Sequence, residues 1–310
     1  RPWLFSFRDH PTADADFWRD RTYHPEEIGV PALFACGYRD VHTGPVVEFF
    51  EGIDAPKRLL LGPWRHTFPE RGREVAIDFR RRAVEWFDRF LKGEENGALD
   101  SPTITYWTER DGGWEVGGGV WRPADRWPTA DDETGVLAFA LSPDGLVEEG
   151  AFDAGRLAAD YEYDHTVGVE SLARIGSIVN TGADTSADDA RSLVFETAPL
   201  DAPVELTGTG AATVRLRATT AEPLVAVRVV DVGPRGSAKL VTAGHLKASH
   251  RNGHETPEPL DPGEEYEIEV PLKPKSHVFE AGHRIRASIS AAYFPRALPP
   301  REHGSFTVRS

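Results

Sequence analysis

Several residue types and patterns are missing from this sequence, and each absence narrows the possible class of protein. There is no methionine and only one cysteine, Cys36, which excludes a disulfide framework. No apolar run is long enough to span a membrane and no signal-like segment stands at the N-terminus, so nothing in the sequence places the chain in or across a membrane. Lysine is scarce and stands only at positions 57, 92, 239, 247, 273 and 275.

The charge balance is acidic. The formal net charge is -15, from 50 Asp and Glu residues against 35 Lys and Arg residues. Nucleic acids and anionic membranes are bound through Lys and Arg, so neither is an expected partner. An acidic, lysine-poor composition suits solubility at high salt concentration, and we hypothesise a halophilic source.

The length and composition predict an ordered globular protein. The chain has 310 residues, of which 40% are hydrophobic and 10% aromatic, and this is enough for two domains with a core each. The lack of methionine and the opening RPWLFSFRDHP, which has no helix cap or strand start, lead us to expect a fragment of a longer protein.

The segment from Val30 to His66 predicts a strand, a helix and a second strand. Residues 31–36 and 57–61 are short apolar runs that end at turn residues, a pattern typical of parallel strands buried on both faces. Between them, Pro45 suits the first turn of a helix and Gly52 suits its end.

Asp40 and His66 are the candidate catalytic residues. Each follows the carboxyl end of one of these strands, where ligands gather in open α/β sheets. A histidine oriented by a carboxylate can move a proton between a nucleophile and a leaving group, and an acid followed by a histidine is the order found in α/β-hydrolases. From the residues alone, the alternative stays open that Asp40 only stabilises a turn and His66 only caps a helix.

A nucleophile is missing from the sequence. No serine stands in a G-x-S-x-G motif. The nearest sites, Gly176-Ser177 and Gly236-Ser237, are predicted surface turns. Cys36 lies inside a predicted strand and cannot readily present a thiolate. We expect the catalytic serine to be absent from this chain.

Other kinds of site have weaker support, and no metal or cofactor is predicted. The histidines and acids lack metal-ligand spacing, and Gly117–Gly119 does not open a helix that would bind phosphate. The tryptophans suit either a carbohydrate platform or the packing of a sandwich core or domain seam. The residues considered are His10, His24, His42, His66, Asp9, Asp14 and Asp40 for a metal, and Trp107, Trp114, Trp121 and Trp127 for a carbohydrate.

The pattern of the chain changes near residue 98. Before it, Phe17 and Trp18 predict a short helix, and the spacing over 75–92 predicts an amphipathic helix that ends at Gly93. After it, short β-rich runs between turn residues predict a β-sandwich or jelly roll, interrupted by a polar surface loop over 158–192. The runs are 104–108, 136–141, 161–165, 192–197, 204–208, 213–219, 224–232, 265–272, 284–290 and 305–310.

Motifs along nearly the whole chain resemble the cocaine esterase/X-Pro dipeptidyl-peptidase family of serine hydrolases. GYRD at Gly37–Asp40 looks like the family's acid turn, and GPWRH, which ends at His66, looks like its histidine segment. VEWFDRFLKGEENG is similar to its next helix, and FEAGHRIRASISAAYFPR to part of its jelly roll. The departures are Arg39 beside the acid and Ala291-Ala292-Tyr293 before the final FPR.

The resemblance implies an α/β plus all-β protein. Residues 1–97 would form the end of a helical cap and the C-terminal part of an α/β-hydrolase domain, and residues 98–310 a jelly-roll domain. It also implies a serine that attacks a small ester or short peptide, with His66 as general base and acid and Asp40 orienting it. The family's nucleophile and oxyanion-hole groups have no counterpart here, so we expect the chain alone to be inactive.

Two further possibilities stay open at this stage. The nucleophile half of a cleaved enzyme would be a separate N-terminal chain, and the protein could also assemble as a homo-oligomer. The alternative function is a non-catalytic carbohydrate- or protein-binding module built on the jelly roll.

Overall fold

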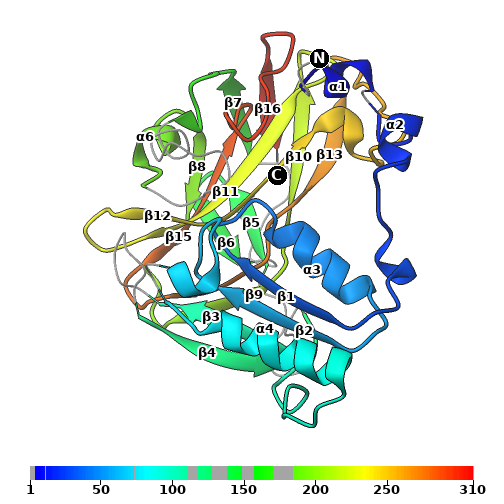
Figure 1. The fold of residues 1–310 in the computed structure, drawn as a ribbon. Coiled ribbons are helices and arrows are strands. Elements are labelled where there is room, and N and C mark those ends of the chain that lie inside the picture. Colours follow the sequence, from blue (N-terminus) through cyan, green and yellow to red (C-terminus); the bar gives the residue numbers. More distant parts are fainter. Residues whose placement is uncertain are drawn as a thin grey trace.

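A computed structural model describes residues 4–10, 12–72, 75–110, 118–127, 138–148, 157–169 and 184–309. Two short helices at the N-terminus, α1 (Leu4–Asp9) and α2 (Asp16–Arg19), lie beside the strands of the C-terminal half (Figure 1). The predicted short helix at Phe17 and Trp18 is therefore present as α2. No helix of the described residues is long and apolar enough to cross a membrane.

The predicted strand, helix and strand are confirmed. After the short helix η1 (Pro25–Glu27), β1 (Ala32–Gly37) and β2 (Lys57–Gly62) pair in parallel, with Gly37 opposite Gly62. The connecting helix α3 (Thr43–Gly52) buries Val47 and Phe50 against these strands. Because the strands are parallel and in register, their carboxyl ends meet at the same edge of the sheet.

The sheet that contains β1 and β2 continues into the C-terminal half of the chain. It has six strands in the order β1, β2, β3 (Ile104–Glu109), β14 (Lys275–Phe279) and β9 (Val204–Gly208), with β4 (Gly119–Ala124) paired to β3. The predicted domain boundary near residue 98 stays a prediction, but one hydrogen-bonded sheet contains strands from both sides of it.

Two four-stranded antiparallel sheets share the largest apolar core. Side chains from both sheets, including Leu216, Val227, Ile268 and Phe306, are buried in this core, which makes the region sheet-rich as predicted. The jelly-roll topology stays a prediction.

One sheet has the order β13 (Glu265–Pro271), β10 (Ala211–Ala218), β16 (Ser305–Arg309) and β7 (Ala158–Glu162). The other has the order β12 (Ala238–Lys247), β11 (Leu224–Val232), β15 (Arg284–Ser290) and β8 (Leu193–Glu196), and β5 (Phe139–Ser142) and β6 (Gly145–Glu148) form a hairpin.

The helix predicted over 75–92 begins later than expected. The α-helix α4 covers Phe79–Phe87 and continues as the π-helical segment η3 (Asp88–Lys92). The Asp78 side chain accepts a hydrogen bond from the main-chain N–H of Arg81 at 3.1 Å, which caps the helix and excludes 75–78 from it. Gly93, with a φ of 75°, ends it as predicted.

The surface loop predicted over 158–192 is wrong at both ends. It begins with the strand β7, which pairs with β16, and near its end lies the short helix α6 (Ser186–Asp189). Asp189 there is buried and accepts hydrogen bonds from Arg286 and Ser288, so a polar sequence is buried through ionic pairing. Residues 170–183 lie outside the described part of the chain.

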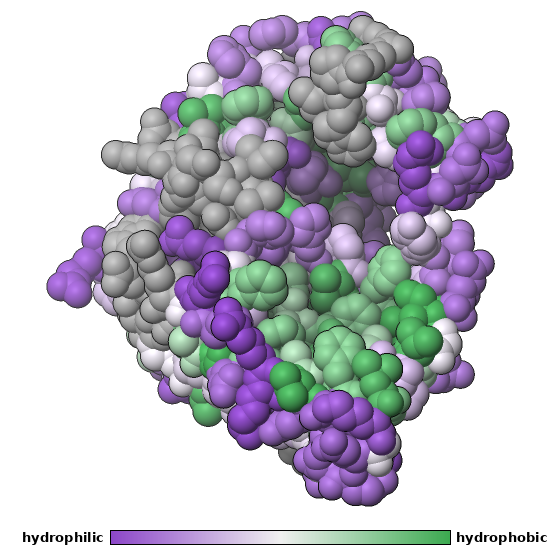
Figure 2. Space-filling view, viewed as in Figure 1, coloured by the Kyte–Doolittle hydropathy of each residue, from purple (hydrophilic) through white to green (hydrophobic). Residues whose placement is uncertain are grey.

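One edge of the long sheet has no partner strand among the described residues. β1 stands at the end of the strand order and pairs with β2 alone. Figure 2 shows apolar side chains gathered over β1, α3 and α4. The exposed large apolar residues of this part include Val84, Phe87 and Leu91. An unpaired edge beside an apolar face is a surface that another segment can cover.

Candidate active site

The turns that follow β1 and β2 are held together through the main chain. The N–H of Arg39 donates to the carbonyl oxygen of Trp64 at 3.1 Å. A Cβ atom added to Gly37 would lie 2.0 Å from the same oxygen, so only glycine allows the two turns to approach this closely. This contact brings Asp40, in the first turn, to His66, in the second.

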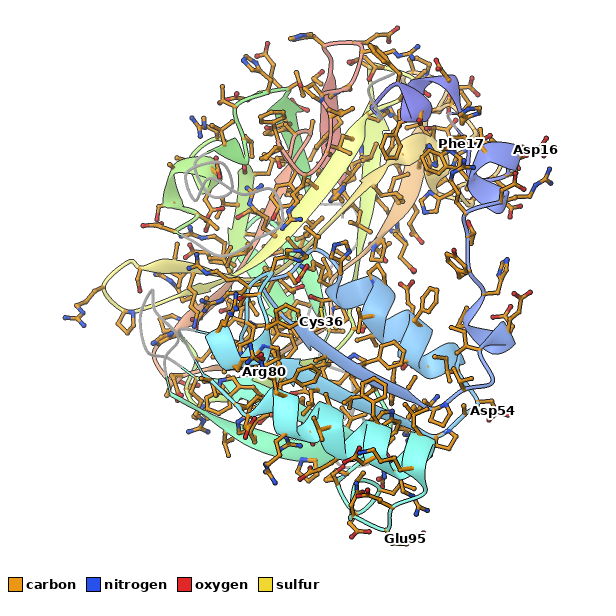
Figure 3. All side chains as sticks on the ribbon, viewed as in Figure 1. Asp16, Phe17, Cys36, Asp54, Arg80 and Glu95 are labelled. Atoms are coloured by element: carbon orange, nitrogen blue, oxygen red, sulfur yellow. The ribbon has the colours of Figure 1, made fainter. Side chains whose placement is uncertain are left out.

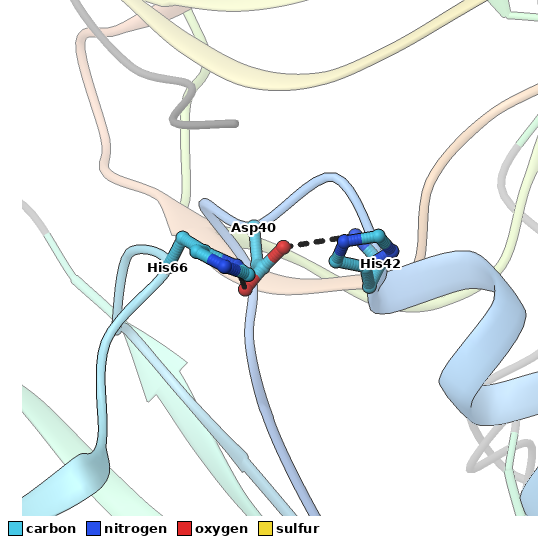
Figure 4. Close-up of side chains that lie close together, drawn as sticks. All are labelled: Asp40, His42 and His66. Atoms are coloured by element: carbon cyan, nitrogen blue, oxygen red, sulfur yellow. Dashed lines mark hydrogen bonds and ion pairs between the residues drawn. The ribbon is translucent and has the colours of Figure 1, made fainter. Parts of the chain in front are cut away.

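Asp40 and His66 form a hydrogen-bonded pair. Nδ1 of His66 lies 2.8 Å from Oδ2 of Asp40. The other carboxylate oxygen, Oδ1, accepts the main-chain N–H of His42 at 3.0 Å (Figure 4). The Asp40 side chain is 11% exposed and the His66 side chain 52%, so a well-shielded acid orients a base that is open to the surface.

The alternative interpretation, in which Asp40 stabilises a turn and His66 caps a helix, agrees with the structure for Asp40 but not for His66. Asp40 does stabilise its own turn, through the bond from His42, but its second oxygen remains for His66. His66 does not stand at the N-cap of the short helix η2 (Pro69–Arg71) that follows, because Phe68 holds that position.

Two supports of the acid turn were not predicted from the sequence. The fully buried Thr43 places Oγ1 2.7 Å from the carbonyl oxygen of Gly37 and 2.9 Å from that of Asp40. Lys273, from the link between β13 and β14, donates to the Asp40 carbonyl oxygen. Burial and the nearby Arg296 lower the pKa of Lys273 to about 8. The only sequence signal for Lys273 is the rarity of lysine in this chain.

Arg39, a departure from the family pattern, belongs to a buried ionic cluster behind the acid turn. Its Nη2 atom lies 3.6 Å from Oε1 of Glu109 on β3, and Lys275 on β14 donates to Oε2 of the same carboxylate at 2.6 Å. Burial raises the pKa of Glu109, but Lys275, Arg39 and Lys239 together outweigh it and hold that pKa well below its usual range. Glu109 is therefore ionised, and it links the acid turn to the C-terminal half.

Cys36 is not placed to act as a nucleophile, as expected. It lies on β1 and is buried, whereas Arg80 and Glu95, labelled with it in Figure 3, are exposed. Its thiol lies 4.0 Å from Oγ1 of Thr43, and burial, with a smaller contribution from Asp40, raises the thiol pKa to about 11. A thiol in this setting stays protonated at neutral pH.

The remaining site candidates do not gather into a second centre. His10 stacks on Phe17, and His24 pairs with Glu26. The ligand-type atoms of Asp40, His42 and His66 lie within 4.8 Å of one another, the one such group of three among the described residues. Two of those atoms already share the short hydrogen bond between Asp40 and His66.

The serine and tryptophan candidates lie mostly in turns and packed positions. Ser237 stands in the turn between β11 and β12, where its carbonyl oxygen accepts the N–H of Gly233. Trp127 is buried, and Trp107 and Trp121 pack edge to face at 5.3 Å. The tryptophans thus fit core and seam packing. Ser177, Gly117 and Trp114 lie outside the described residues.

Comparisons with known proteins cover almost the whole chain. Residues 96–310 match the family model described as the X-Pro dipeptidyl-peptidase C-terminal non-catalytic domain, and residues 1–68 match that of X-Pro dipeptidyl-peptidase. The chain belongs to the cocaine esterase/X-Pro dipeptidyl-peptidase family. Members of this family are serine hydrolases, and their names include both esterases and dipeptidyl-peptidases.

Individual relatives agree with this membership. Cocaine esterase of a Rhodococcus species is 28% identical over 327 residues, covering 95% of this chain and 54% of the relative. The Xaa-Pro dipeptidyl-peptidase of Lactobacillus helveticus is 21% identical over 349 residues, covering 95% of this chain and 41% of the relative. The chain spans about half the length of the curated relatives it matches.

Solved structures show the same fold at low sequence identity. An aminopeptidase from a marine sediment archaeon of the Thaumarchaeota superposes with a TM-score of 0.78 at 22% identity, covering 99% of this chain and 57% of that one. An α-amino acid ester hydrolase superposes with a TM-score of 0.77 at 19% identity, covering 99% of this chain and 58% of that one.

Proposed function

We propose that this chain supplies the acid and the base of a serine hydrolase that cleaves acyl ester or peptide bonds. The observation that carries the proposal is the 2.8 Å contact between His66 Nδ1 and Asp40 Oδ2, at the carboxyl ends of two adjacent parallel strands. In this arrangement Asp40 selects the tautomer with the proton on Nδ1 and stabilises the imidazolium.

His66 then acts as general base through its other ring nitrogen, Nε2. It takes the proton of a serine hydroxyl as the oxygen attacks the substrate carbonyl, and returns it to the leaving alcohol or amine. Water repeats the sequence on the acyl-enzyme. The half-exposed histidine ring supports this role, because a serine and a substrate can reach it from the surface.

The attacking serine lies outside these 310 residues in this proposal. None of the serines of the chain stands in a G-x-S-x-G motif, the sharp turn that presents a nucleophile in α/β-hydrolases. Among the residues that the structure describes, β1 pairs on one side only, and this edge and the adjoining apolar face support a partner segment there, since the rest of a hydrolase sheet would pair at this edge. Without a nucleophile to form the tetrahedral intermediate, the chain alone is expected to be inactive.

The proposed substrates are small acyl esters or short peptides with proline at the second position. The names of the relatives, cocaine esterase and Xaa-Pro dipeptidyl-peptidase, support these two classes. The acidic composition argues against polyanionic substrates.

The test compares two proteins with a p-nitrophenyl ester and an X-Pro p-nitroanilide. The first is the 310-residue chain, and the second is the product of the same gene with its upstream coding sequence. The proposal expects turnover only from the second, and it expects His66→Ala to abolish that turnover. The matched control is His42→Ala. His42 is a neighbouring exposed histidine, and the substitution keeps its main-chain N–H, which donates a hydrogen bond to Asp40.

Two results would contradict the proposal in different ways. If the 310-residue chain hydrolysed either substrate and His66→Ala abolished that activity, an external nucleophile would be refuted, but the role of His66 as the base would stand. Full activity of His66→Ala in the longer protein would refute the role of the pair itself.

A second function applies to the C-terminal part of the chain. The family model that matches residues 96–310 is described as non-catalytic, which supports a binding or assembly role for this region. If this role were the whole function, glycan or protein binding would be measurable and Asp40→Asn would leave it unchanged.

A further inference from the structure

A cavity of about 480 Å³ lies between the acid turn and the C-terminal half of the chain. Its wall is formed by the start of α3, by β12, by the link between β13 and β14, and by residues around Tyr293. This volume is in the range of pockets that bind small organic molecules. Neither His42 nor His66 lines it.

The cavity wall is strongly basic in an otherwise acidic protein. Glu48 is the one acidic residue of the lining within the described chain, whereas the basic lining residues are Arg39, Lys239, Lys273, Lys275 and Arg296. Glu109, behind the wall, lies close to three of these cations, at 2.6 Å from Lys275, 3.6 Å from Arg39 and 3.8 Å from Lys239. Glu109 thus carries one negative charge beside three cations, and Glu48 adds one acidic side chain to the wall.

Several donors of the wall have no hydrogen-bond partner among the described residues. They are the hydroxyl of Tyr293, Nζ of Lys239 and Nη2 of Arg296, all shielded from solvent. Tyr293 is only 3% exposed. Buried polar groups are nearly always hydrogen-bonded, so a cluster of unsatisfied donors indicates a missing acceptor. Ammonium and guanidinium groups only donate, and they form their strongest hydrogen bonds with anionic acceptors.

Part of the wall is apolar and can hold the carbon skeleton of such a ligand. Leu240, Val241 and Leu272 line the cavity beside the charged groups. A few convergent polar groups on an otherwise apolar wall are typical of sites for small organic molecules.

We propose that this cavity is a binding site for a small organic anion that carries a carboxylate or a phosphate. Lys239, Arg296 and the Tyr293 hydroxyl bind its charged group, and the apolar wall packs against its body. The site adjoins the acid turn, because Lys273 lines the cavity and also donates to the main chain of Asp40. The inference depends only on the cavity and its donors, and it holds whether or not the proposed hydrolase function is correct.

The test is isothermal titration of the 310-residue chain with inorganic phosphate and, separately, with benzoate, at constant ionic strength set with chloride. Saturable binding of either anion is expected, and the anion that saturates identifies the charged group recognised. Lys239→Gln should weaken that binding at least about tenfold, because it removes a charged donor from a desolvated site. Tyr293→Phe should weaken it as well while keeping the fold, because the lost hydroxyl has no partner in the protein.

The matched control is Arg215→Gln, which removes the same charge from an exposed ion pair with Glu267 on β10 and β13. It should bind like the unmodified chain. The proposal is overturned if neither anion saturates, or if Lys239→Gln and Tyr293→Phe bind as tightly as Arg215→Gln does.

Discussion

Gly37 lies against the carbonyl oxygen of Trp64 so closely that a Cβ atom at position 37 would stand 2.0 Å from it. The contact joins the turn that carries Asp40 to the turn that carries His66. This backbone contact holds the two turns together, and the side chains of the proposed acid and base then meet in a hydrogen bond of 2.8 Å.

Gly37→Ala should lower the free energy of unfolding by about 3 kcal/mol, because the clash is with main-chain atoms that cannot rotate away. Urea denaturation followed by tryptophan fluorescence measures the loss. Gly29→Ala is the matched control, since an added Cβ there meets nothing within 4 Å. Equal stability of the two variants would show that the turns can separate without cost.

Asp40→Asn, in the longer protein that carries the nucleophile, should reduce kcat by roughly four orders of magnitude. The amide can still accept the N–H of His42, so the turn is kept, but it no longer holds the Nδ1–H tautomer of His66. Ester hydrolysis measures kcat, and an unchanged unfolding curve confirms that the fold survives. A decrease of less than about tenfold would remove Asp40 from the mechanism.

Lys273→Met should change the pH dependence of stability. The pKa of Lys273 falls from 10.5 to about 8 on folding, mainly through burial. Between these values the unfolded chain holds the proton that the folded chain has lost, so the unmodified protein gains stability as the pH rises. The variant lacks this gain.

The variant should therefore lose about 2 kcal/mol of stability relative to the unmodified chain between pH 7 and pH 10. Denaturation of both proteins in a buffer without phosphate or carboxylate measures the difference. A difference that stays constant over this range would show that folding does not perturb Lys273.

Cys36 should resist thiol reagents in the folded chain at pH 8. Its side chain is buried and its pKa is raised to about 11, so both access and thiolate are lacking. With Ellman's reagent the native chain should stay unmodified, and the chain in denaturant should release one equivalent of chromophore from its one cysteine. Rapid labelling of the native chain would mean that β1 opens readily.

The part of the fold that apolar patterns encode was predictable from the sequence. The strands predicted over 31–36 and 57–61 appear as β1 and β2 with a shift of one residue at most, and the helix between them ends at Gly52. The prediction that Asp40 and His66 lie at neighbouring strand ends followed from the same pattern, because parallel strands end at one edge.

The parts that were not predicted depend on polar groups that are buried by pairing. β14 reads Lys-Ser-His-Val-Phe, a polar start that predicts no buried strand, yet every residue of it is buried. His277, for example, lies 2.8 Å from a carboxylate oxygen of Asp231 on β11. Lys273 reaches an acid turn more than two hundred positions earlier in the chain. Such pairs form only in the folded protein, and no local pattern encodes them.

Residues 96–310 match a family model described as non-catalytic, yet their strand β3 pairs in parallel with β2. This region therefore supports the strand that positions the proposed catalytic base. β2 leads directly to His66, and β3 covers the edge that β2 would otherwise expose. Cutting the chain near residue 98 would leave main-chain N–H and C=O groups of Leu59–Leu61 without partners and release the anchors on Arg39 and Asp40. Engineering this protein by exchanging its C-terminal half would therefore alter the positions of the acid and the base, even though no residue of that half takes part in the proposed proton transfer.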